Sequence, residues 1–199
     1  MYSQNREEEV ILNYFGDFKG AFCSIGENDG VTLSNVRQLA LNGWSGVCVE
    51  PSTQAFSKLK KLYDGVKGIY TYDFAIGTHN GRMEFYESGT HLNKGDTGLL
   101  STNNEEELKR FPGTEYTKTE VKCFRWRTAL NRFRIKKFDF FSIDAEGFDM
   151  EIVEQIDFAD AKLVCVEWNG VTERKAIYDA FFKDFKLIYT SPENLIYGR

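Results

Sequence analysis

Continuous apolar runs recur along the chain, and segments with helical periodicity separate most of them. Runs without polar alternation are typical of strands that are buried on both faces of a sheet. They cover 21–25, 46–50, 68–72, 138–143 and 163–166. Because apolar residues recur at helical spacing over 33–40 and 55–63, strands and helices alternate, and the pattern predicts a parallel sheet with right-handed crossovers.

The two ends of the chain add a helix and a hairpin to this sheet. Apolar residues at helical spacing follow three glutamates and predict an N-terminal helix over about 4–15, whose acidic start suits the positive end of the helix dipole. Near the other end, 185–189 and 195–197 have the pattern of two strands joined by a turn. The sequence therefore predicts a single α/β domain over 1–199, a sandwich around a seven-stranded, mostly parallel sheet with a C-terminal antiparallel hairpin.

The segment 87–119 departs from this alternation. It is polar and contains several glycines, and only 105–111 has a helical pattern. Loops of this length inside a compact domain are usually functional, so we interpret the segment as a lid or a substrate-recognition insert. The alternative is a disordered excursion on the surface.

Composition and charge exclude several classes of function. The formal charge is -5, and the longest basic cluster, 132–137, is short. A protein that neutralises many phosphates needs a larger basic surface, so we expect no nucleic-acid partner. No apolar stretch approaches the roughly 20 residues of a membrane span, and the N-terminus is too acidic for a signal peptide. We therefore expect a cytoplasmic protein without a membrane partner.

A glycine turn follows the first predicted strand, where nucleotide-binding folds place their cofactor. A dinucleotide fingerprint aligned on Gly26 requires further glycines at 28 and 31, where this chain has Asn28 and Val31. A side chain at position 28 obstructs a pyrophosphate, which S-adenosylmethionine does not contain. Asn28 also tolerates the left-handed backbone better than most residues. The turn therefore favours S-adenosylmethionine over a dinucleotide.

Acidic residues follow the next two predicted strands. Glu50 is placed to accept two hydrogen bonds from a ribose diol, which is a charge-assisted contact. Asp73 could accept from the adenine amino group, with Phe74 against the ring. Because a strand-terminal acid is often only a helix cap or a surface charge, the joint spacing of these residues supports a nucleoside site better than any one of them does.

Several segments together resemble the FkbM family of S-adenosylmethionine-dependent methyltransferases. They are 3–4, 25–30, 34–35, 43–47, 50–51, 75–77 and 139–147. The resemblance covers nearly the whole chain, and the Ile-Asp-x-Glu-Gly pattern of 143–147 is its most specific part. It implies a class I methyltransferase fold, which is a Rossmann-like three-layer sandwich, and methylation of a hydroxyl on a sugar or small metabolite.

The spacing and the resemblance together predict a cofactor site. Its residues are Gln4, Ser24, Gly26, Glu27, Asn28, Asp29, Gly30, Glu50, Pro51, Ser52, Asp73, Phe74, Ala75 and Asp144. One position departs from the family, whose usual Asp-Ile-Gly-Ala is Ser-Ile-Gly-Glu here. The carboxylate that commonly holds the amino group of the cofactor is therefore missing at Ser24. Glu27, Asp144 or a water on Ser24 could take over its role.

Asp144 and Glu146 are the candidates for catalysis. Methyl transfer to an alcohol requires the enzyme to position the oxygen and to help remove its proton, and these acids follow the fourth buried strand, at the edge where ligands bind. Catalysis without a metal is the first hypothesis. The alternative is a magnesium ion that lowers the pKa of the acceptor, held by Asp144, Glu167 and Asn169 as in catechol-type O-methyltransferases. Glu167 and Asn169 could instead only shape the pocket.

Three further side chains have two interpretations each. His91, in the insert, could be a general base or a histidine without a role, and Trp126 and Trp168 could form a wall of the acceptor site or pack in the core. We expect a small-molecule or glycan acceptor, and the sequence pattern leaves the oligomeric state open. A second hypothesis, motivated by Ser24, is a methyltransferase-like binding or regulatory module without catalysis.

Overall fold

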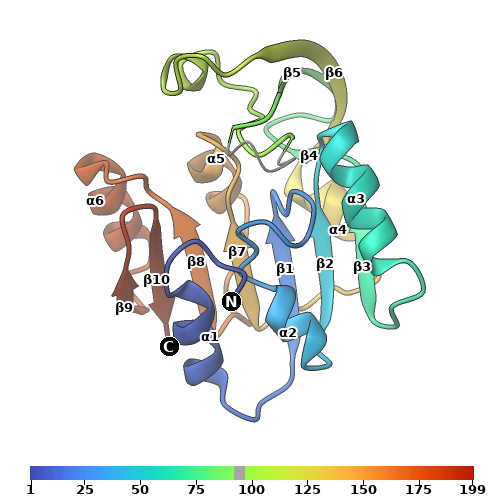
Figure 1. Cartoon of the computed structure of the whole chain (residues 1–199). Coiled ribbons are helices and arrows are strands. Elements are labelled where there is room, and N and C mark those ends of the chain that lie inside the picture. The colour runs from blue at the N-terminus through green and yellow to red at the C-terminus, as the bar shows by residue number, and fades with distance from the viewer. Residues whose placement is uncertain (92–96) are drawn as a thin grey trace.

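The computed structural model describes residues 1–91 and 97–199, and a seven-stranded sheet runs through it (Figure 1). The order is β3-β2-β1-β7-β8-β10-β9. The strands are β1 Ala21–Ile25, β2 Ser45–Val49, β3 Ile69–Tyr72, β7 Phe140–Ile143, β8 Leu163–Glu167, β9 Lys186–Thr190 and β10 Asn194–Gly198. β10 runs antiparallel to both of its neighbours, and the other adjacent pairs are parallel. The predicted α/β class, with a mostly parallel seven-stranded sheet and an antiparallel C-terminal hairpin, is confirmed.

Helices cover both faces of the sheet, which explains the continuous apolar runs. On one face lie α1 Glu7–Phe15, α2 Arg37–Leu41 and α3 Thr53–Tyr63, and on the other lie α4 Trp126–Arg132, α5 Asp149–Val153 and α6 Thr172–Phe181. Successive residues of a strand point to opposite faces. Phe22 therefore packs with the first group of helices, and Cys23 packs with the second. Each face buries its own core cluster, and the result is a three-layer sandwich.

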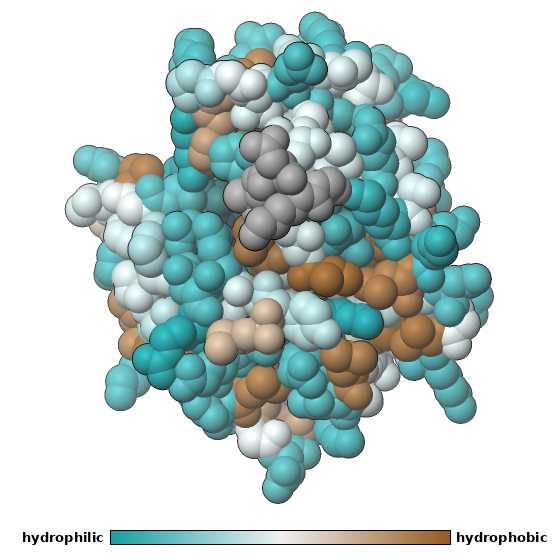
Figure 2. Space-filling model, in the orientation of Figure 1, coloured by the Kyte–Doolittle hydropathy of each residue, from teal (hydrophilic) through white to brown (hydrophobic). Residues whose placement is uncertain are grey.

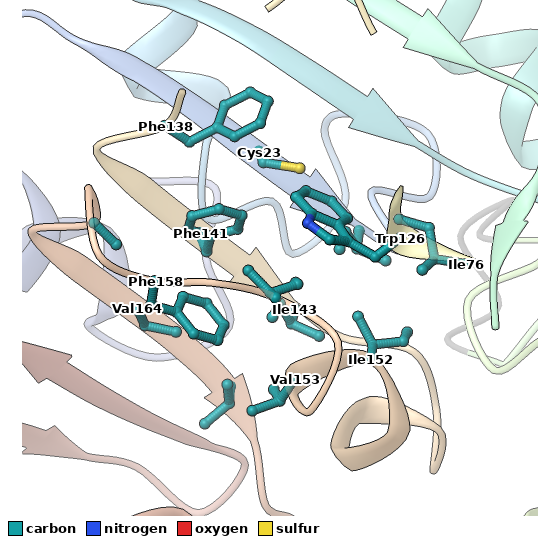
Figure 3. Close-up of a cluster of buried hydrophobic side chains, with 14 of the residues drawn as sticks. Cys23, Ile76, Trp126, Phe138, Phe141, Ile143, Ile152, Val153, Phe158 and Val164 are labelled. Atoms are coloured by element: carbon teal, nitrogen blue, oxygen red, sulfur yellow. The ribbon is translucent and has the colours of Figure 1, made fainter. Parts of the chain in front are cut away.

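Figure 3 shows the larger of the two core clusters, on the face covered by α4 to α6. Phe141 and Ile143 of β7 lie at its centre, with Trp126 and Ile152 of the covering helices to their right in the view. Trp126 is 6% exposed and packs against Phe141 with ring centroids 5.9 Å apart. Of the two interpretations of this tryptophan, the structure supports core packing.

A second sheet of three strands lies above the carboxyl ends of the main sheet in Figure 1. It consists of β4 Ala75–Ile76, β5 Gly81–Ser88 and β6 Tyr116–Phe124. β6 pairs antiparallel with β5 and parallel with β4. The sequence pattern predicts shorter strands here, because alternating polar and apolar residues on a half-exposed sheet give a weaker signal than a buried run.

The segment predicted as an insert over 87–119 is bounded by this sheet. β5 extends to Ser88 and β6 begins at Tyr116, so strand pairing includes both ends of the predicted range. Between the strands, the 3-10 helix η1 (Glu107–Lys109) occupies part of the predicted helix over 105–111. The rest of 89–115 follows an irregular path, apart from 92–96, which lie outside the described residues. We refer to 89–115 as the insert.

The face of the molecule shown in Figure 2 is mostly hydrophilic, with apolar residues gathered in a band near its centre. The large apolar side chains that are exposed include Leu41 and Ile177 on helices, and scattered residues of this kind are normal on folded proteins. In the part of the chain that the structure describes, no helix is both long enough and apolar enough to cross a membrane.

Gly46 of β2 provides a test of this packing. A Cβ at Gly46 would lie 2.2 Å from the buried ring of Phe22, so we expect Gly46→Ala to lower the free energy of unfolding by about 1–3 kcal/mol through overpacking. Urea denaturation measures this change. Gly89→Ala is the matched control, because its Cβ would meet Glu115 at an ordinary 3.5 Å, and its effect should stay within about 0.5 kcal/mol. Equal effects of the two substitutions would contradict the packing described here.

Candidate functional site

A cavity opens at the carboxyl edge of the main sheet, where β1, β2, β7 and β8 end. The chain leaves β1 toward β2 on one side and reaches β7 on the other, so the cavity lies at a topological switch point, where open α/β sheets bind their ligands. The predicted cofactor residues that line it are Gln4, Ser24, Gly26, Glu27, Asn28, Glu50, Pro51, Phe74, Ala75 and Asp144.

Gly26 joins the two halves of the site. Its φ is +78°, and a Cβ built on it would lie 1.7 Å from the carbonyl oxygen of Asp144. Only glycine allows the turn after β1 to approach the end of β7 this closely. The backbone contact therefore brings two segments together that are distant in the sequence: the glycine turn and the Asp-Ala-Glu-Gly loop that follows β7.

Glu50 is buried at the end of β2 and holds the turn after β1 in place. Its carboxylate accepts hydrogen bonds from the backbone N–H groups of Asn28, at 2.8 Å, and Ser52, at 2.7 Å. Asn28 has a φ of +53°, as its position in the turn predicts. Its side chain is 7% exposed, and neither its Oδ1 nor its Nδ2 has a hydrogen-bond partner among the described residues. A buried amide without a partner is costly, so this side chain fits a site that a polar ligand completes.

Glu27 forms a second buried carboxylate site on the same turn. Ser24 donates its hydroxyl hydrogen to Oε2 at 2.5 Å, and Ser34 donates to Oε1 at 2.6 Å. Glu27 is 4% exposed, and burial raises the pKa of its carboxyl to about 7, against the two hydroxyl hydrogen bonds that lower it. Burial also raises the pKa of Glu50 to about 7. The position where the family has an aspartate thus holds a serine that is bonded to a neighbouring carboxylate.

The acidic residues after β7 and β8 form the other end of the cavity. One carboxylate oxygen each from Asp144, Glu146 and Glu167 lie within 4.8 Å of one another. Burial is the main cause that raises their pKa values, to about 6 for Asp144 and well above the ordinary value for Glu146 and Glu167. Their mutual repulsion raises the pKa of the two glutamates further. The structure thus brings together the two predicted catalytic residues, Asp144 and Glu146, and two of the three predicted metal ligands, Asp144 and Glu167.

A fourth acid, Asp149 at the start of α5, shapes the loop that carries this cluster. Its carboxylate accepts hydrogen bonds from the backbone of Ala145, at 2.7 Å, and of Gly147, at 3.3 Å. Glu146 lies between these two residues with a φ of +47°. Asp149 thus holds the strained backbone on both sides of Glu146. Thr102 of the insert holds it as well, because its hydroxyl donates to the Glu146 carbonyl at 2.7 Å.

The insert contacts the acidic end of the cavity through charged side chains. Arg110 lies 3.1 Å from a carboxylate oxygen of Glu107 and 3.8 Å from one of Glu146. Arg174 of α6 binds the other oxygen of Glu107 at 3.1 Å. The insert thereby connects to the loop after β7 and to α6. The described part of the insert also brings His91 to the cavity lining, where its ring lies against Phe111.

Four predicted cofactor residues do not line the cavity. Asp73 is exposed and pairs with Lys122 of β6 at 2.8 Å, because β6, which the sequence places far away, passes beside it. Asp29 accepts hydrogen bonds from the backbone N–H groups of Val31 and Thr32. The other two, Gly30 and Ser52, contact residues next to the cavity. Gly30 packs close to the side chains of α3, and Ser52 donates its N–H to Glu50 and accepts a hydrogen bond at the start of α3.

Trp168 and Asn169 follow β8 and lie differently from one another. The indole N–H of Trp168 donates to the carbonyl of Ser191 at 2.8 Å, and the residue does not line the cavity. Asn169 does line it, with a φ of +53°, and its Nδ2 has no hydrogen-bond partner among the described residues. Trp126 and Trp168, which the sequence suggested as a wall of the acceptor site, therefore both lie outside the cavity lining.

Sequence reasoning missed several lining residues. The main ones are Ser34, Asn35, Ser142 and Arg110. Asn35 donates to the hydroxyl of Ser142 at 3.2 Å and so connects the segment before α2 to β7. Ser34 and Asn35 belong to a segment that carries the family resemblance, which was a usable signal. Arg110 lies in the insert, where no periodicity or motif indicates the direction of a side chain.

Comparisons with known proteins agree on a class. The family model of the methyltransferase FkbM domain matches residues 24–190, whereas a comparison with curated proteins gives no match. Methyltransferase FkbM from Methylobacillus flagellatus has a similar structure, with a TM-score of 0.55 and 10% identity over 91% of this chain and 44% of that chain. A putative RNA methyltransferase from Pyrococcus horikoshii has a TM-score of 0.52 and 12% identity, over 98% of this chain and 83% of that chain. TrmK from M. capricolum, in complex with S-adenosylhomocysteine, has a TM-score of 0.52 and 10% identity, over 100% of this chain and 69% of that chain.

The fold and the position of the site define a class I methyltransferase. Because the family model matches most of the sequence, the chain belongs to the FkbM methyltransferase family, as the motifs predict. This chain spans less than half the length of the FkbM structure to which it is similar. The expectation of S-adenosylmethionine as the cofactor is confirmed by the family and by structures of this fold that contain S-adenosylhomocysteine.

The raised pKa values of Glu27 and Glu50 predict how stability depends on pH. Each carboxyl has an ordinary pKa of 4.5 and a pKa of about 7 in the folded chain, so the folded state binds more protons between these values and its stability falls as pH rises. One pKa unit corresponds to about 1.4 kcal/mol. We therefore expect the melting temperature of the ligand-free protein to fall by about 5 °C or more between pH 5 and pH 8.

Differential scanning calorimetry across this pH range measures the effect. Glu27→Gln removes one of the carboxyls with a raised pKa, so its melting temperature should depend less steeply on pH than that of the unmodified protein. A melting temperature that rises from pH 5 to pH 8 would show that these carboxyls are not buried as described.

Proposed function

We propose that this chain transfers the methyl group of S-adenosylmethionine to a hydroxyl oxygen of a small molecule. One observation carries the proposal. A single cavity has the buried carboxylates Glu27 and Glu50 at one end and the pair Asp144 and Glu146 at the other. The first end suits a ligand with a ribose diol and an amino group, and the second suits an acceptor that must lose a proton. When bound, the cofactor supplies an electrophilic methyl group on a sulfonium.

Glu50 and Asn28 are the proposed contacts to the nucleoside. Glu50 uses one lone pair of each carboxylate oxygen for a backbone N–H, and a carboxylate has about four lone-pair sites, so both oxygens can still accept from a ribose diol. The amide of Asn28, which has no partner among the described residues, lies on the same turn. Phe74 and Ala75 of the cavity lining provide apolar surface for the adenine ring.

Glu27 is the proposed partner of the amino group of the cofactor. In the family pattern this role belongs to an aspartate at the position of Ser24. Here the Ser24 hydroxyl donates to Glu27, so the carboxylate is displaced by three positions and the serine orients it. An ammonium group beside Glu27 would favour the ionised carboxylate and lower its pKa from about 7.

Asp144 and Glu146 are the proposed proton acceptors at the other end. An alcohol becomes a better nucleophile when a base takes its proton during attack. Burial raises the pKa of Asp144 to about 6 and of Glu146 well above its ordinary value, and a base is most effective when its pKa is near the working pH. Asp144 also touches Gly26 through its carbonyl oxygen, so the acid lies beside the cofactor turn.

The charge of the cavity favours a neutral acceptor over RNA. The lining contains the acids Glu27, Glu50, Asp144, Glu146, Glu167 and Glu193, and Arg110 is the one lysine or arginine among its described residues. Phosphates bind where Lys and Arg side chains concentrate. The similar structure described as a putative RNA methyltransferase is 12% identical, so it supports the fold and not the substrate.

Methyl transfer can be tested with labelled S-adenosylmethionine. We expect label to enter neutral hydroxylated small molecules, including free sugars, and to resist mild alkali, because a methyl ether is stable where a methyl ester is cleaved. Unmodified tRNA is included as a competing acceptor. Label in tRNA without label in any small molecule would contradict the proposed substrate class, and binding of the cofactor without transfer to any acceptor would favour the non-catalytic module.

Glu50→Gln tests the nucleoside contact. We expect S-adenosylhomocysteine to bind about 1.5–3 kcal/mol more weakly, because hydrogen bonds to a charged group are lost. Isothermal titration calorimetry at pH 8 with EDTA present measures this. Glu167→Gln is the matched control, since Glu50 directly follows β2, Glu167 is the last residue of β8 and both are 5% exposed. It should keep the affinity within about threefold. Equal affinities of the two variants would mean that Glu50 does not contact the ribose.

A pair of substitutions at 24 and 27 tests the displaced carboxylate. Glu27→Ala should weaken binding of S-adenosylhomocysteine by about tenfold or more. Adding Ser24→Asp in the same chain restores the family pattern and should recover most of that loss. If the double variant binds no better than Glu27→Ala alone while both remain folded by circular dichroism, Glu27 does not replace the family aspartate.

A further inference from the structure

The acidic end of the cavity holds more carboxylates than proton transfer needs. Asp144 and Glu146 come from the loop after β7, and Glu167 ends β8, which is the neighbouring strand. Their carboxylate oxygens lie within 4.8 Å of one another. Like charges this close repel one another strongly where water does not screen them fully. An arrangement of this kind is stable only if protons or a cation reduce the repulsion.

Neighbouring groups satisfy other buried acids of the site on both carboxylate oxygens, whereas Glu167 interacts with the Asn169 amide and keeps one oxygen without a partner. Asp149 accepts two backbone hydrogen bonds, and Glu27 accepts two from hydroxyls. Glu167 is 5% exposed, and its Oε2 has no hydrogen-bond partner among the described residues. A buried carboxylate oxygen without a partner is rare in folded proteins and indicates a group that an ion or a ligand completes.

The cations close to the cluster already have partners. Arg110 lies 3.8 Å from Glu146 but nearer, at 3.1 Å, to Glu107. Arg174 binds Glu107 on its other oxygen. These two arginines therefore share one glutamate of the insert, and neither forms an ion pair with Glu167 or Asp144 among the described residues. The cluster keeps an excess of negative charge on the side that faces the cavity.

We propose that Asp144, Glu146 and Glu167 bind one divalent cation of the Mg²⁺ or Mn²⁺ class. Hard cations of this kind take oxygen ligands, and the oxygens around one Mg²⁺, each at 2.0–2.1 Å, lie up to about 4.2 Å apart. The separation of up to 4.8 Å between the three carboxylates closes to this size by small side-chain rotations. Waters or acceptor oxygens complete the coordination, as is usual for Mg²⁺. The proposed ligands differ from those predicted from the sequence in one residue: the Glu146 carboxylate replaces the Asn169 amide.

The cation gives the proposed methyl transfer its acceptor specificity, and this part of the inference rests on the proposed function. A hydroxyl bound to the cation has a lowered pKa. Its oxygen attacks the methyl carbon, the carbon–sulfur bond breaks and leaves its electron pair on sulfur, and the hydroxyl proton passes to Asp144 or Glu146, the proposed proton acceptors, and from there to solvent water. A molecule with two adjacent oxygens, such as a vicinal diol, can occupy two coordination positions at once. We therefore assign vicinal oxygens as the feature by which the site selects its acceptor.

Metal binding is tested without the cofactor, so that it stands apart from the cofactor test above. MnCl₂ is titrated into the whole chain at pH 8, and free Mn²⁺ is measured by electron paramagnetic resonance. We expect one site per chain, about tenfold or more weaker in Glu167→Gln. Glu50→Gln, equally buried at the end of β2, should bind Mn²⁺ within about twofold of the unmodified chain. Glu167→Gln is thus the test variant for Mn²⁺ and the control for S-adenosylhomocysteine, and Glu50→Gln is the reverse.

Two results would overturn the site: no binding of Mn²⁺ by the unmodified chain up to about 5 mM, a weak limit for an oxygen-ligand site, or equal affinities in Glu167→Gln and Glu50→Gln. If Glu167→Gln does not fold by circular dichroism, Glu146→Gln replaces it with the same expectation, since Glu146 is partly exposed. The titration with S-adenosylhomocysteine contains EDTA, so a failure there rejects the proposed cofactor contacts and leaves the metal result unaffected.

Discussion

The burial of carboxylates at one edge of the sheet is the constraint on which the site depends. Helices on both faces exclude water from the strands, so polar groups gather where β1, β2, β7 and β8 end. Ionised carboxylates in such a place need hydrogen-bond donors. Glu50 obtains them from two backbone N–H groups, and Glu27 obtains them from two hydroxyls. These bonds hold the turn after β1 in the shape that a cofactor would contact.

The insert and the second sheet complete this edge rather than standing apart from it. β5 and β6 carry the insert above the ends of the main strands (Figure 1). From there Thr102 binds the carbonyl of Glu146, and Arg110 lies beside the carboxylate of the same residue. A Cβ on Gly147 would meet the side chain of Glu107 at 2.7 Å, so the loop after β7 and the insert are in close contact. The acceptor end of the cavity is therefore formed by two segments that are distant in the sequence.

Particular residues show where sequence reasoning succeeded and where it could not. Glu50 and Asn28 were predicted from spacing alone, and the structure places both in the cavity lining. Asp73 has the same local signature as Glu50, an acid after a buried strand, yet it turns outward and pairs with Lys122. Local pattern cannot separate the two, because the difference arises from β6, which passes beside Asp73 and not beside Glu50.

The sequence by itself determined the α/β class, the alternation of strands and helices in the main sheet, and the acids that follow its strands. These depend on local periodicity and on the topology that parallel strands impose. Only the tertiary structure decided which side chains meet: Ser24 with Glu27, Gly26 with Asp144, and Glu167 with Asp144 and Glu146. The reason is that the direction of a side chain at the end of a strand depends on the register and twist of the neighbouring strands and on loop conformation. A local sequence pattern does not specify any of these.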